Sequence, residues 1–210
     1  MPGQLHVITH PLVQHKLTLL RDKKLSTRGF RELTQEIGAL LAYEIMRDAP
    51  TKPVTVETPL GTANGVELDG KKQVLVTILR AGLGVLDGML QVLPSARVGH
   101  IGLYRDPKLR TAVEYYLKLP SGMDQRDAVV ISSVLATGGS AGAAVRRVIE
   151  TGPRTVKFAC LVACTEGIAR FHEEHPDVPI YTCAVDEQIN ERGFIVPGLG
   201  DVGNRLYGTE

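Results

Sequence analysis

The stretch that decides the fold runs Val129-Val130-Ile131-Ser132-Ser133-Val134-Leu135-Ala136-Thr137-Gly138-Gly139-Ser140-Ala141. Its apolar start is typical of a buried parallel strand, and its end passes through small residues into a helical pattern. Glycines let the backbone turn tightly and approach a ligand, while the unpaired N–H groups at the start of a helix attract anions. The stretch therefore predicts a phosphate-binding turn, with an ordinary turn and a helix capped by Ser140 as the alternative. It lacks the lysine of the P-loop nucleotidases.

Strand and helix patterns alternate along most of the chain. They predict an α/β fold with a mainly parallel sheet flanked by helices, in which residues 1–210 form one domain. Apolar runs predict strands at residues 74–79, 98–104, 111–117, 127–131, 156–162 and 180–185. Helical spacing predicts helices after His10-Pro11, after Ser26 or Thr27, between Gly84 and Pro94, at residues 141–150 and at residues 166–174. Residues 54–68 instead alternate about Pro59-Leu60-Gly61 and predict a β-hairpin arm.

Composition narrows the class of protein. Of the 210 residues, 43% are hydrophobic and 22% are charged, which suits a globular protein with a substantial core. The net charge of +1 gives no reason to expect nucleic acid or an anionic membrane as a partner. The sequence shows neither an apolar stretch of transmembrane length nor a secretory signal. Three cysteines without paired metal spacing indicate reduced thiols packed as small apolar side chains, and a cytoplasmic location.

Arg80 follows the apolar run at residues 74–79 and precedes the small residues Ala81 and Gly82. The carboxyl ends of parallel strands form the edge where α/β sheets bind their ligands. An arginine at that edge can donate two parallel hydrogen bonds to a phosphate. We expect Arg80 to bind a phosphate group, and a surface arginine that covers the sheet edge is the alternative.

The segment from Phe194 to Arg205 is rich in glycine and carries a single proline and a single aspartate, Asp201. Glycines at positions 198, 200 and 203 leave backbone N–H and C=O groups exposed. Such groups can hydrogen-bond the edge of a planar heterocycle. The segment therefore predicts a C-terminal base-binding loop, with a loose terminal loop as the alternative.

Four motifs stand in order along the chain: Ile78-Leu79-Arg80-Ala81-Gly82, Tyr104-Arg105-Asp106, Leu135-Ala136-Thr137-Gly138-Gly139-Ser140-Ala141 and Ile195-Val196-Pro197-Gly198-Leu199-Gly200-Asp201. With them the sequence resembles the uracil phosphoribosyltransferases over nearly its whole length. The resemblance implies the type I phosphoribosyltransferase fold. It also implies condensation of uracil with 5-phosphoribosyl 1-diphosphate to give UMP and diphosphate. This reaction is a glycosyl transfer of pyrimidine salvage that usually uses Mg²⁺.

The resemblance implies roles for the residues at matching positions. Arg80, Arg105 and Asp201 would be catalytic, and Mg²⁺ would be bound mainly through the substrate, with no direct protein ligand. Ribosyl diphosphate would be bound by Arg80, Ala81, Gly82, Arg105, Ser132, Ser133, Val134, Leu135, Ala136, Thr137, Gly138, Gly139, Ser140 and Asp201. Within that set, the run from Ala136 to Ala141 would hold the 5-phosphate. Uracil would be read by Ile195 and by the backbone of Gly200, Asp201 and Val202.

Three positions in or near the predicted site differ from the family pattern. Ser132 stands where the family usually has the aspartate of an Asp-Pro-Met run, Phe194 where it commonly has tyrosine, and Asn204 where it commonly has aspartate. Hydrogen bonds to charged groups contribute about 1.5 to 3 kcal/mol, so the loss of one predicts about ten- to a hundredfold weaker affinity or rate. A second hypothesis is therefore a catalytically weak or inactive homologue that binds nucleotide or ribosyl phosphate as a regulator or partner subunit. A phosphoribosyltransferase for another base is a third.

The resemblance also implies an assembly and an effector. It implies a homodimer or a homotetramer and leaves that choice open, and the hairpin arm could add to a second copy. GTP is an effector of some members of the family. The loop from Asp106 to Thr111 is a candidate for closing over the substrate.

Overall fold

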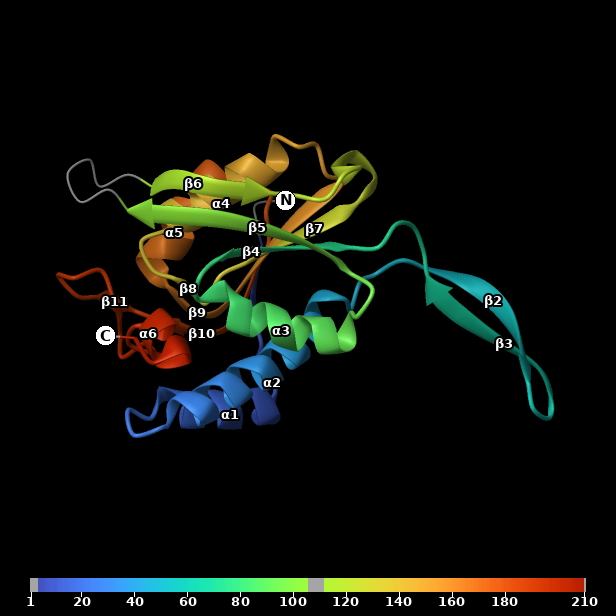
Figure 1. The fold of residues 1–210 in the computed structure, drawn as a ribbon, viewed down its shortest axis with the longest axis horizontal. Coiled ribbons are helices and arrows are strands. Elements are labelled where there is room, and N and C mark those ends of the chain that lie inside the picture. Colours follow the sequence, from blue (N-terminus) through green and yellow to red (C-terminus); the bar gives the residue numbers. More distant parts are fainter. Residues whose placement is uncertain (1–3, 106–111, 210) are drawn as a thin grey trace.

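A sheet of eight strands forms the centre of the molecule in the computed structural model, which describes residues 4–105 and 112–209. Its order is β1-β10-β9-β7-β4-β5-β6, and the short β8 pairs with β9 (Figure 1). The strands are β1 (Leu5–Val7), β4 (Val74–Leu79), β5 (Arg97–Arg105), β6 (Ala112–Lys118), β7 (Asp127–Ile131), β8 (Val134–Leu135), β9 (Thr155–Cys164) and β10 (Ile180–Asp186). Strand pairs in this described sheet are parallel except for β5 with β6, so the predicted mainly parallel sheet is confirmed.

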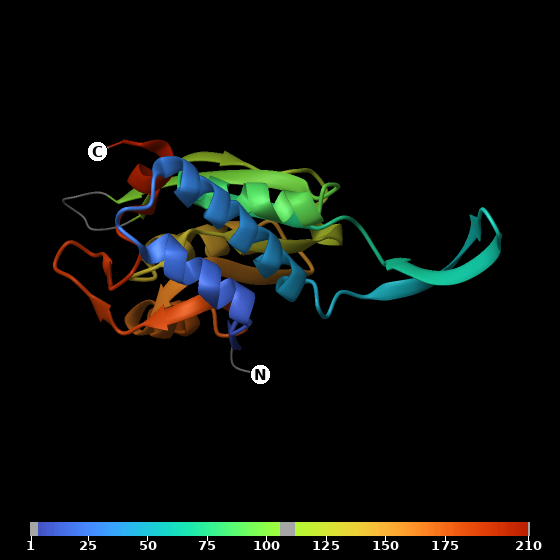
Figure 2. The same cartoon turned by 90° about the horizontal axis from the view of Figure 1, so that it is seen from below.

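Helices cover both faces of the sheet, as predicted. On one face lie α1 (Pro11–Arg21), α2 (Thr27–Ile45) and α3 (Gly82–Val92), and on the other lie α4 (Gly139–Ile149) and α5 (Thr165–Glu174) (Figures 1 and 2). Alternate strand residues serve the two layers: Leu75 packs with α1, α2 and α3, while Val74 and Val76 pack with α4 and α5. This alternation follows from the two-residue repeat of a strand and explains why β4 is apolar throughout.

The predicted hairpin arm is formed by β2 (Thr51–Thr58) and β3 (Gly61–Leu68), which pair antiparallel as a separate two-stranded sheet. It projects from the body at the side away from the C-terminal helix α6 (Val202–Tyr207) (Figure 1). Pairing begins three residues earlier than the alternation predicted, at Thr51, and includes Pro53. A proline is tolerated there because a two-stranded ribbon consists of edge strands.

Two sequence interpretations are corrected by the structure. The helix α4 begins at Gly139 and has Gly138 as its N-cap, with a φ of 82° and no side-chain hydrogen bond, so the cap is not Ser140. The C-terminal segment is not a loose loop: β11 (Gln188–Ile189) pairs with β12 (Ile195–Val196), and α6 follows. The edge strand β1 was not predicted, because three residues are too few to show a repeat.

The three cysteines are free and buried, as the sequence predicted. Burial raises the pKa of Cys160 and of Cys183 to about 12, so both thiols are protonated at neutral pH. Across the described residues, the helices are too short or too polar to span a bilayer.

Candidate active site

Two loops lie side by side at the carboxyl edge of the sheet, because β4 and β7 are neighbouring parallel strands with Thr77 opposite Ile131. The Arg80 loop (residues 80–82) follows β4, and the glycine loop (residues 132–140) follows β7. The two loops touch: a methyl group added to Gly82 would lie 2.9 Å from the carbonyl oxygen of Ile131. Sheet register therefore brings together the two segments that the sequence singled out separately.

The Arg80 loop passes directly into α3. The carbonyl oxygen of Arg80 accepts a hydrogen bond from the N–H of Leu83 at 3.1 Å, and Ala81 is the N-cap of α3 without a side-chain partner. Beneath the loop, the buried hydroxyl of Thr77 finds no hydrogen-bond partner among the described residues. A methyl group on Gly82 would lie 2.4 Å from that hydroxyl oxygen. A glycine is thus needed at position 82 for α3 to start this close to β4.

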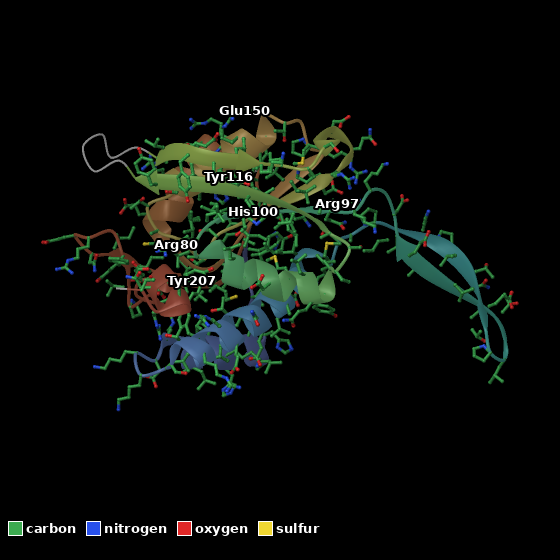
Figure 3. The ribbon with its side chains drawn as sticks, viewed as in Figure 1. Arg80, Arg97, His100, Tyr116, Glu150 and Tyr207 are labelled. Atoms are coloured by element: carbon green, nitrogen blue, oxygen red, sulfur yellow. The ribbon has the colours of Figure 1, made fainter. Side chains whose placement is uncertain are left out.

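The side chain of Arg80 lies beside Tyr207 of α6, and Figure 3 labels both residues. Its guanidinium carbon lies 5.8 Å from the centroid of the Tyr207 ring. The Tyr207 hydroxyl donates a hydrogen bond to the backbone oxygen of Arg80 at 3.1 Å. On the same helix, a methyl group added to Gly203 would lie 3.9 Å from Nη2 of Arg80. The predicted phosphate-binding arginine and the predicted base-binding segment therefore adjoin.

Hydrogen bonds to β9 and one bond within the loop hold the glycine loop. The N–H of Ser132 donates to the carbonyl oxygen of Ala159 at 3.0 Å, and its hydroxyl donates to the carbonyl oxygen of Val134 at 3.0 Å. The carbonyl oxygen of Ser133 accepts from the N–H of Leu161 at 3.0 Å, and β8 continues the pairing with β9. Ser132, the residue that departs from the family pattern, is thus engaged with the loop itself.

The other side of the glycine loop packs against α5. A methyl group added to Gly167 would lie 2.1 Å from the carbonyl oxygen of Ala136, so helix and loop backbone are in direct contact. Arg170, one turn further along α5, brings a cation beside the loop: its Nη1 and Nη2 lie 3.7 Å from a methyl group placed on Gly139. The sequence analysis gave Arg170 no role, because an exposed arginine on an amphipathic helix carries no distinguishing pattern.

Hydrogen bonds to buried Asp186 anchor the C-terminal segment. The N–H of Gly198 donates to Oδ2 of Asp186 at 3.0 Å, and Arg21 donates to both carboxylate oxygens at 2.8 and 2.9 Å. Oδ1 of Asp201 accepts from the N–H of Asn204 at 2.9 Å and caps α6. The Gly200 and Asp201 positions are exposed, whereas Ile195 and Val202 are buried. The backbone of the segment is therefore exposed at residues 200 and 201, while its apolar side chains pack into the core and hold the segment in place.

Two parts of the predicted site lie partly or wholly outside the residues that the structure describes. The backbone of Arg105 ends β5 opposite Ala112, beside β4, and the side chain of Arg105 is not described. The predicted closing loop at residues 106–111 lies outside the described residues. Within those residues, histidine, cysteine, aspartate and glutamate form no group of three or more that could hold a metal ion.

A hollow of about 790 Å³ lies at the opposite edge of the sheet, near the amino ends of β7 and β9. Four of its charged residues form two ion pairs, Arg154 with Asp127 and Lys157 with Asp48. None of the residues predicted to bind substrate lines it. Because α/β sheets bind ligands at the carboxyl ends of their strands, this hollow lies at the edge opposite to the one where a ligand is expected.

Known proteins are similar to this chain in sequence and in fold. The family model for uracil phosphoribosyltransferase matches residues 7–209. A uracil phosphoribosyltransferase of Rhodococcus jostii is 60% identical over 208 residues, which are 99% of this chain and 100% of the relative. The solved structure of the AQ2163 protein from Aquifex aeolicus has a TM-score of 0.93 at 36% identity and covers 99% of both chains. A hypoxanthine phosphoribosyltransferase from Trypanosoma cruzi has a TM-score of 0.50 at 14% identity, over 76% of this chain and 75% of its own, and shows the fold alone.

The family match and the relatives cover the chain almost from end to end, and they include the segments that carry the Arg80 loop, the glycine loop and α6. The chain belongs to the uracil phosphoribosyltransferase family, within the type I phosphoribosyltransferases.

Proposed function

We propose that the chain joins uracil to the ribosyl group of 5-phosphoribosyl 1-diphosphate where the Arg80 loop, the glycine loop and α6 meet. It is a pentosyltransferase of pyrimidine salvage, as its family membership implies. The observation that carries the location is the parallel register of β4 and β7, which puts two loops suited to anions next to each other. Residues 1–210 act as one phosphoribosyltransferase-like domain in this proposal.

The two loops bind different groups of the ribosyl diphosphate. Arg80, with the backbone N–H groups of Ala81 and Gly82, binds the diphosphate, and Arg105 reaches it from the adjoining strand. The glycine loop holds the rest of the substrate, its serines near the ribose and its turn around the 5-phosphate, through Ser132, Ser133, Val134, Leu135, Ala136, Thr137, Gly138, Gly139 and Ser140. The positive φ of Gly138 and the free start of α4 support this, because both leave backbone N–H groups for an anion.

Uracil is read by the C-terminal segment. Ile195 and the backbone of Gly200, Asp201 and Val202 bind the base, and Asp201 also lies near the ribosyl diphosphate. The exposure of residues 200 and 201 and the anchoring of Gly198 to Asp186 support this role. Rigid backbone groups lose little freedom when they bind a flat ligand, so they suit its recognition.

Electrostatics and positioning supply the catalysis. Displacement of diphosphate from the anomeric carbon develops positive charge on the ribose and negative charge on the leaving group. Arg80 and Arg105 stabilise the departing diphosphate, and Asp201 offers a negative charge on the ribose side. No covalent nucleophile is required, and the protonated thiols of Cys160 and Cys183 supply none.

Mg²⁺ fits this site as a companion of the substrate. Asp201 is the carboxylate among the predicted site residues, and the other donors are arginines, hydroxyls and backbone N–H groups, which suit phosphate oxygens. Mg²⁺ commonly binds proteins through one or two carboxylates together with substrate phosphates and water. When bound, it would neutralise part of the diphosphate charge, and this chain would hold it mainly through the substrate.

The test is UMP formation from labelled uracil, ribosyl diphosphate and Mg²⁺, compared between the wild-type chain, Arg80→Ala and Arg28→Ala. Loss of a preorganised charge donor costs about 10²- to 10³-fold in rate, so Arg80→Ala should form UMP that much more slowly. Arg28 is a matched control, because it is an exposed arginine paired with Glu32 on α2. Equal activity in wild type and Arg80→Ala would contradict the proposal.

One observation favours the second hypothesis, a weak or inactive homologue that binds nucleotide or ribosyl phosphate as a regulator or partner subunit. Ser132 replaces the carboxylate of the family pattern, and its hydroxyl proton is directed at Val134. Two results together would support this second hypothesis: calorimetry shows that ribosyl diphosphate binds, and high concentrations of protein form no UMP. The third hypothesis is a phosphoribosyltransferase for another base. Competition binding with uracil, hypoxanthine and xanthine tests it.

A homodimer or a homotetramer is part of the proposal. The β2–β3 arm is exposed along nearly its whole length, including Val56, Leu60 and Val66. An isolated two-stranded ribbon is marginally stable in water, so apolar contact with a second copy would stabilise it. Light scattering of the wild type and of a chain with residues 52–67 replaced by a short glycine linker tests this; an unchanged mass would contradict it.

GTP as an effector and a cytoplasmic location complete the proposal. The free, buried thiols support the cytoplasmic location, because the cytoplasm keeps cysteines reduced. The net charge of +1 supports neither nucleic acid nor a membrane as a partner. An effect of GTP on the rate of UMP formation, at saturating uracil, would support the regulatory part.

A further inference from the structure

Tyr207, the last residue of α6, contacts Arg80 in two ways. Its hydroxyl donates to the backbone oxygen of Arg80 at 3.1 Å, and its ring lies under the guanidinium at 5.8 Å (Figure 3). We propose that Tyr207 is a positioning residue that fixes the Arg80 loop in the conformation that binds diphosphate. The inference rests on the proposed binding of diphosphate at Arg80.

The hydrogen bond controls a backbone donor as well as a carbonyl. In a trans peptide the C=O of one residue and the N–H of the next point in opposite directions. When the Tyr207 hydroxyl holds the C=O of Arg80, it therefore also fixes the direction of the N–H of Ala81. That N–H is one of the groups proposed to bind diphosphate, and it faces away from Tyr207.

The phenol is suited to remain a donor. Burial and the nearby carboxylate of Asp87 raise the pKa of Tyr207 above its usual value, against the opposing effect of Arg80 and Arg31. The hydroxyl proton is therefore present throughout the neutral range. Neutral phenols are hydrogen-bond donors, so the contact with the Arg80 loop does not depend on pH near 7.

The ring limits the freedom of an exposed arginine. Gly203 and Tyr207 are four residues apart on α6 and therefore share a face, along which the Arg80 side chain lies. A free arginine side chain has many rotamers, and part of that freedom must be lost when a phosphate is bound. A guanidinium already held over a ring loses less.

The arrangement also links the two substrates. α6 is a single short helix with Asp201, a proposed uracil contact, at its start and Tyr207 at its end. Val202 and Leu206 are buried and fix the helix on the core. The base-binding backbone and the support of the Arg80 loop thus belong to one rigid element.

Tyr207→Phe is the test, because it keeps the ring and removes the hydroxyl. The dissociation constant for diphosphate, measured by calorimetry, should rise about three- to tenfold, as expected for one lost hydrogen bond. The KM for ribosyl diphosphate should rise by a similar factor, with the KM for uracil unchanged. Tyr207→Leu also removes the ring and should weaken diphosphate binding further.

Tyr43→Phe is the matched control, because the ring of Tyr43 on α2 lies 5.9 Å from the guanidinium carbon of Arg47, which follows the helix. It should leave both constants unchanged. Diphosphate binding that is equal in wild type and Tyr207→Phe would overturn the inference and leave the proposed function standing. A wild-type chain that binds no diphosphate would overturn the proposed function and, with it, the inference.

Discussion

The Arg80 loop and the glycine loop follow neighbouring strands, yet different parts of the molecule hold them. The Arg80 loop is supported from outside, by Tyr207 on the C-terminal helix. The glycine loop is supported by the hydrogen bond from Ser132 to Val134 within it, by its hydrogen bonds and pairing with β9, and by backbone contact with Gly167. This difference shows which substitutions can disturb each loop. The Arg80 loop is sensitive to changes far away in the sequence, and the glycine loop is sensitive to changes in its own residues or in α5.

The contact at Gly167 gives the largest expected effect. In Gly167→Ala the new methyl group would lie 2.1 Å from the carbonyl oxygen of Ala136, so α5 or the glycine loop must move. Overpacking of this kind costs about 1 to 3 kcal/mol, and we expect the free energy of unfolding to fall by about 2 kcal/mol. Urea unfolding measures the loss, and calorimetry should show weaker UMP binding with little change for diphosphate.

Gly65→Ala is the control for this substitution. Gly65 lies in β3, and a methyl group there would meet no atom within 4 Å. Its free energy of unfolding and its ligand affinities should match those of the wild type. A Gly167→Ala chain that also binds UMP as tightly as the wild type would show that the glycine loop does not depend on α5.

The sequence predicted the elements better than their contacts. The two loops and the strands before them were predicted because apolar runs, glycines and Arg80 are local signals. The support of Arg80 by Tyr207 was missed, because it joins residues 127 positions apart and a terminal tyrosine has no pattern of its own. Long-range contacts of this kind depend on how elements pack, which one sequence does not reveal.

The N-cap of α4 shows the same limit at short range. Both Gly138 and Ser140 are residue types found at helix starts, so the local sequence allows either. The structure uses Gly138, whose φ of 82° suits glycine, and a methyl group there would lie 3.0 Å from the carbonyl oxygen of Gly167. The helix start therefore has both a backbone conformation and a close contact with α5 that suit glycine, and residue type alone does not reveal either.

Ser132→Asp tests the family difference within the glycine loop and has the next largest expected effect. A carboxylate would gain a charged hydrogen bond to the substrate, about 1.5 to 3 kcal/mol, and would lose the neutral bond to Val134, about 1 kcal/mol. The net gain should raise kcat/KM for UMP formation by about tenfold. Steady-state kinetics with labelled uracil measures it.

Ser132→Asn separates charge from shape, because asparagine matches aspartate in size and is neutral. It should change kcat/KM by less than about twofold. If Ser132→Asp brings no gain over the wild type, the rest of the site has changed with Ser132, and the nucleotide-binding homologue becomes the better hypothesis. A gain would show that the loop keeps its substrate geometry without the family carboxylate.

The smallest effect expected is at Thr77, which lies beneath the Arg80 loop. Its buried hydroxyl has no hydrogen-bond partner among the described residues, and Thr77→Val should therefore raise the free energy of unfolding by about 1 kcal/mol. Thr182→Val is the matched control, because the equally buried hydroxyl of Thr182 donates to the carbonyl oxygen of Ala184 at 3.0 Å, and its loss should destabilise. If the Arg80 loop is held by Tyr207 alone, diphosphate affinity stays constant in Thr77→Val. Weaker binding in that chain would show that the loop is also held from below, and the contrast between the two loops would then be one of degree.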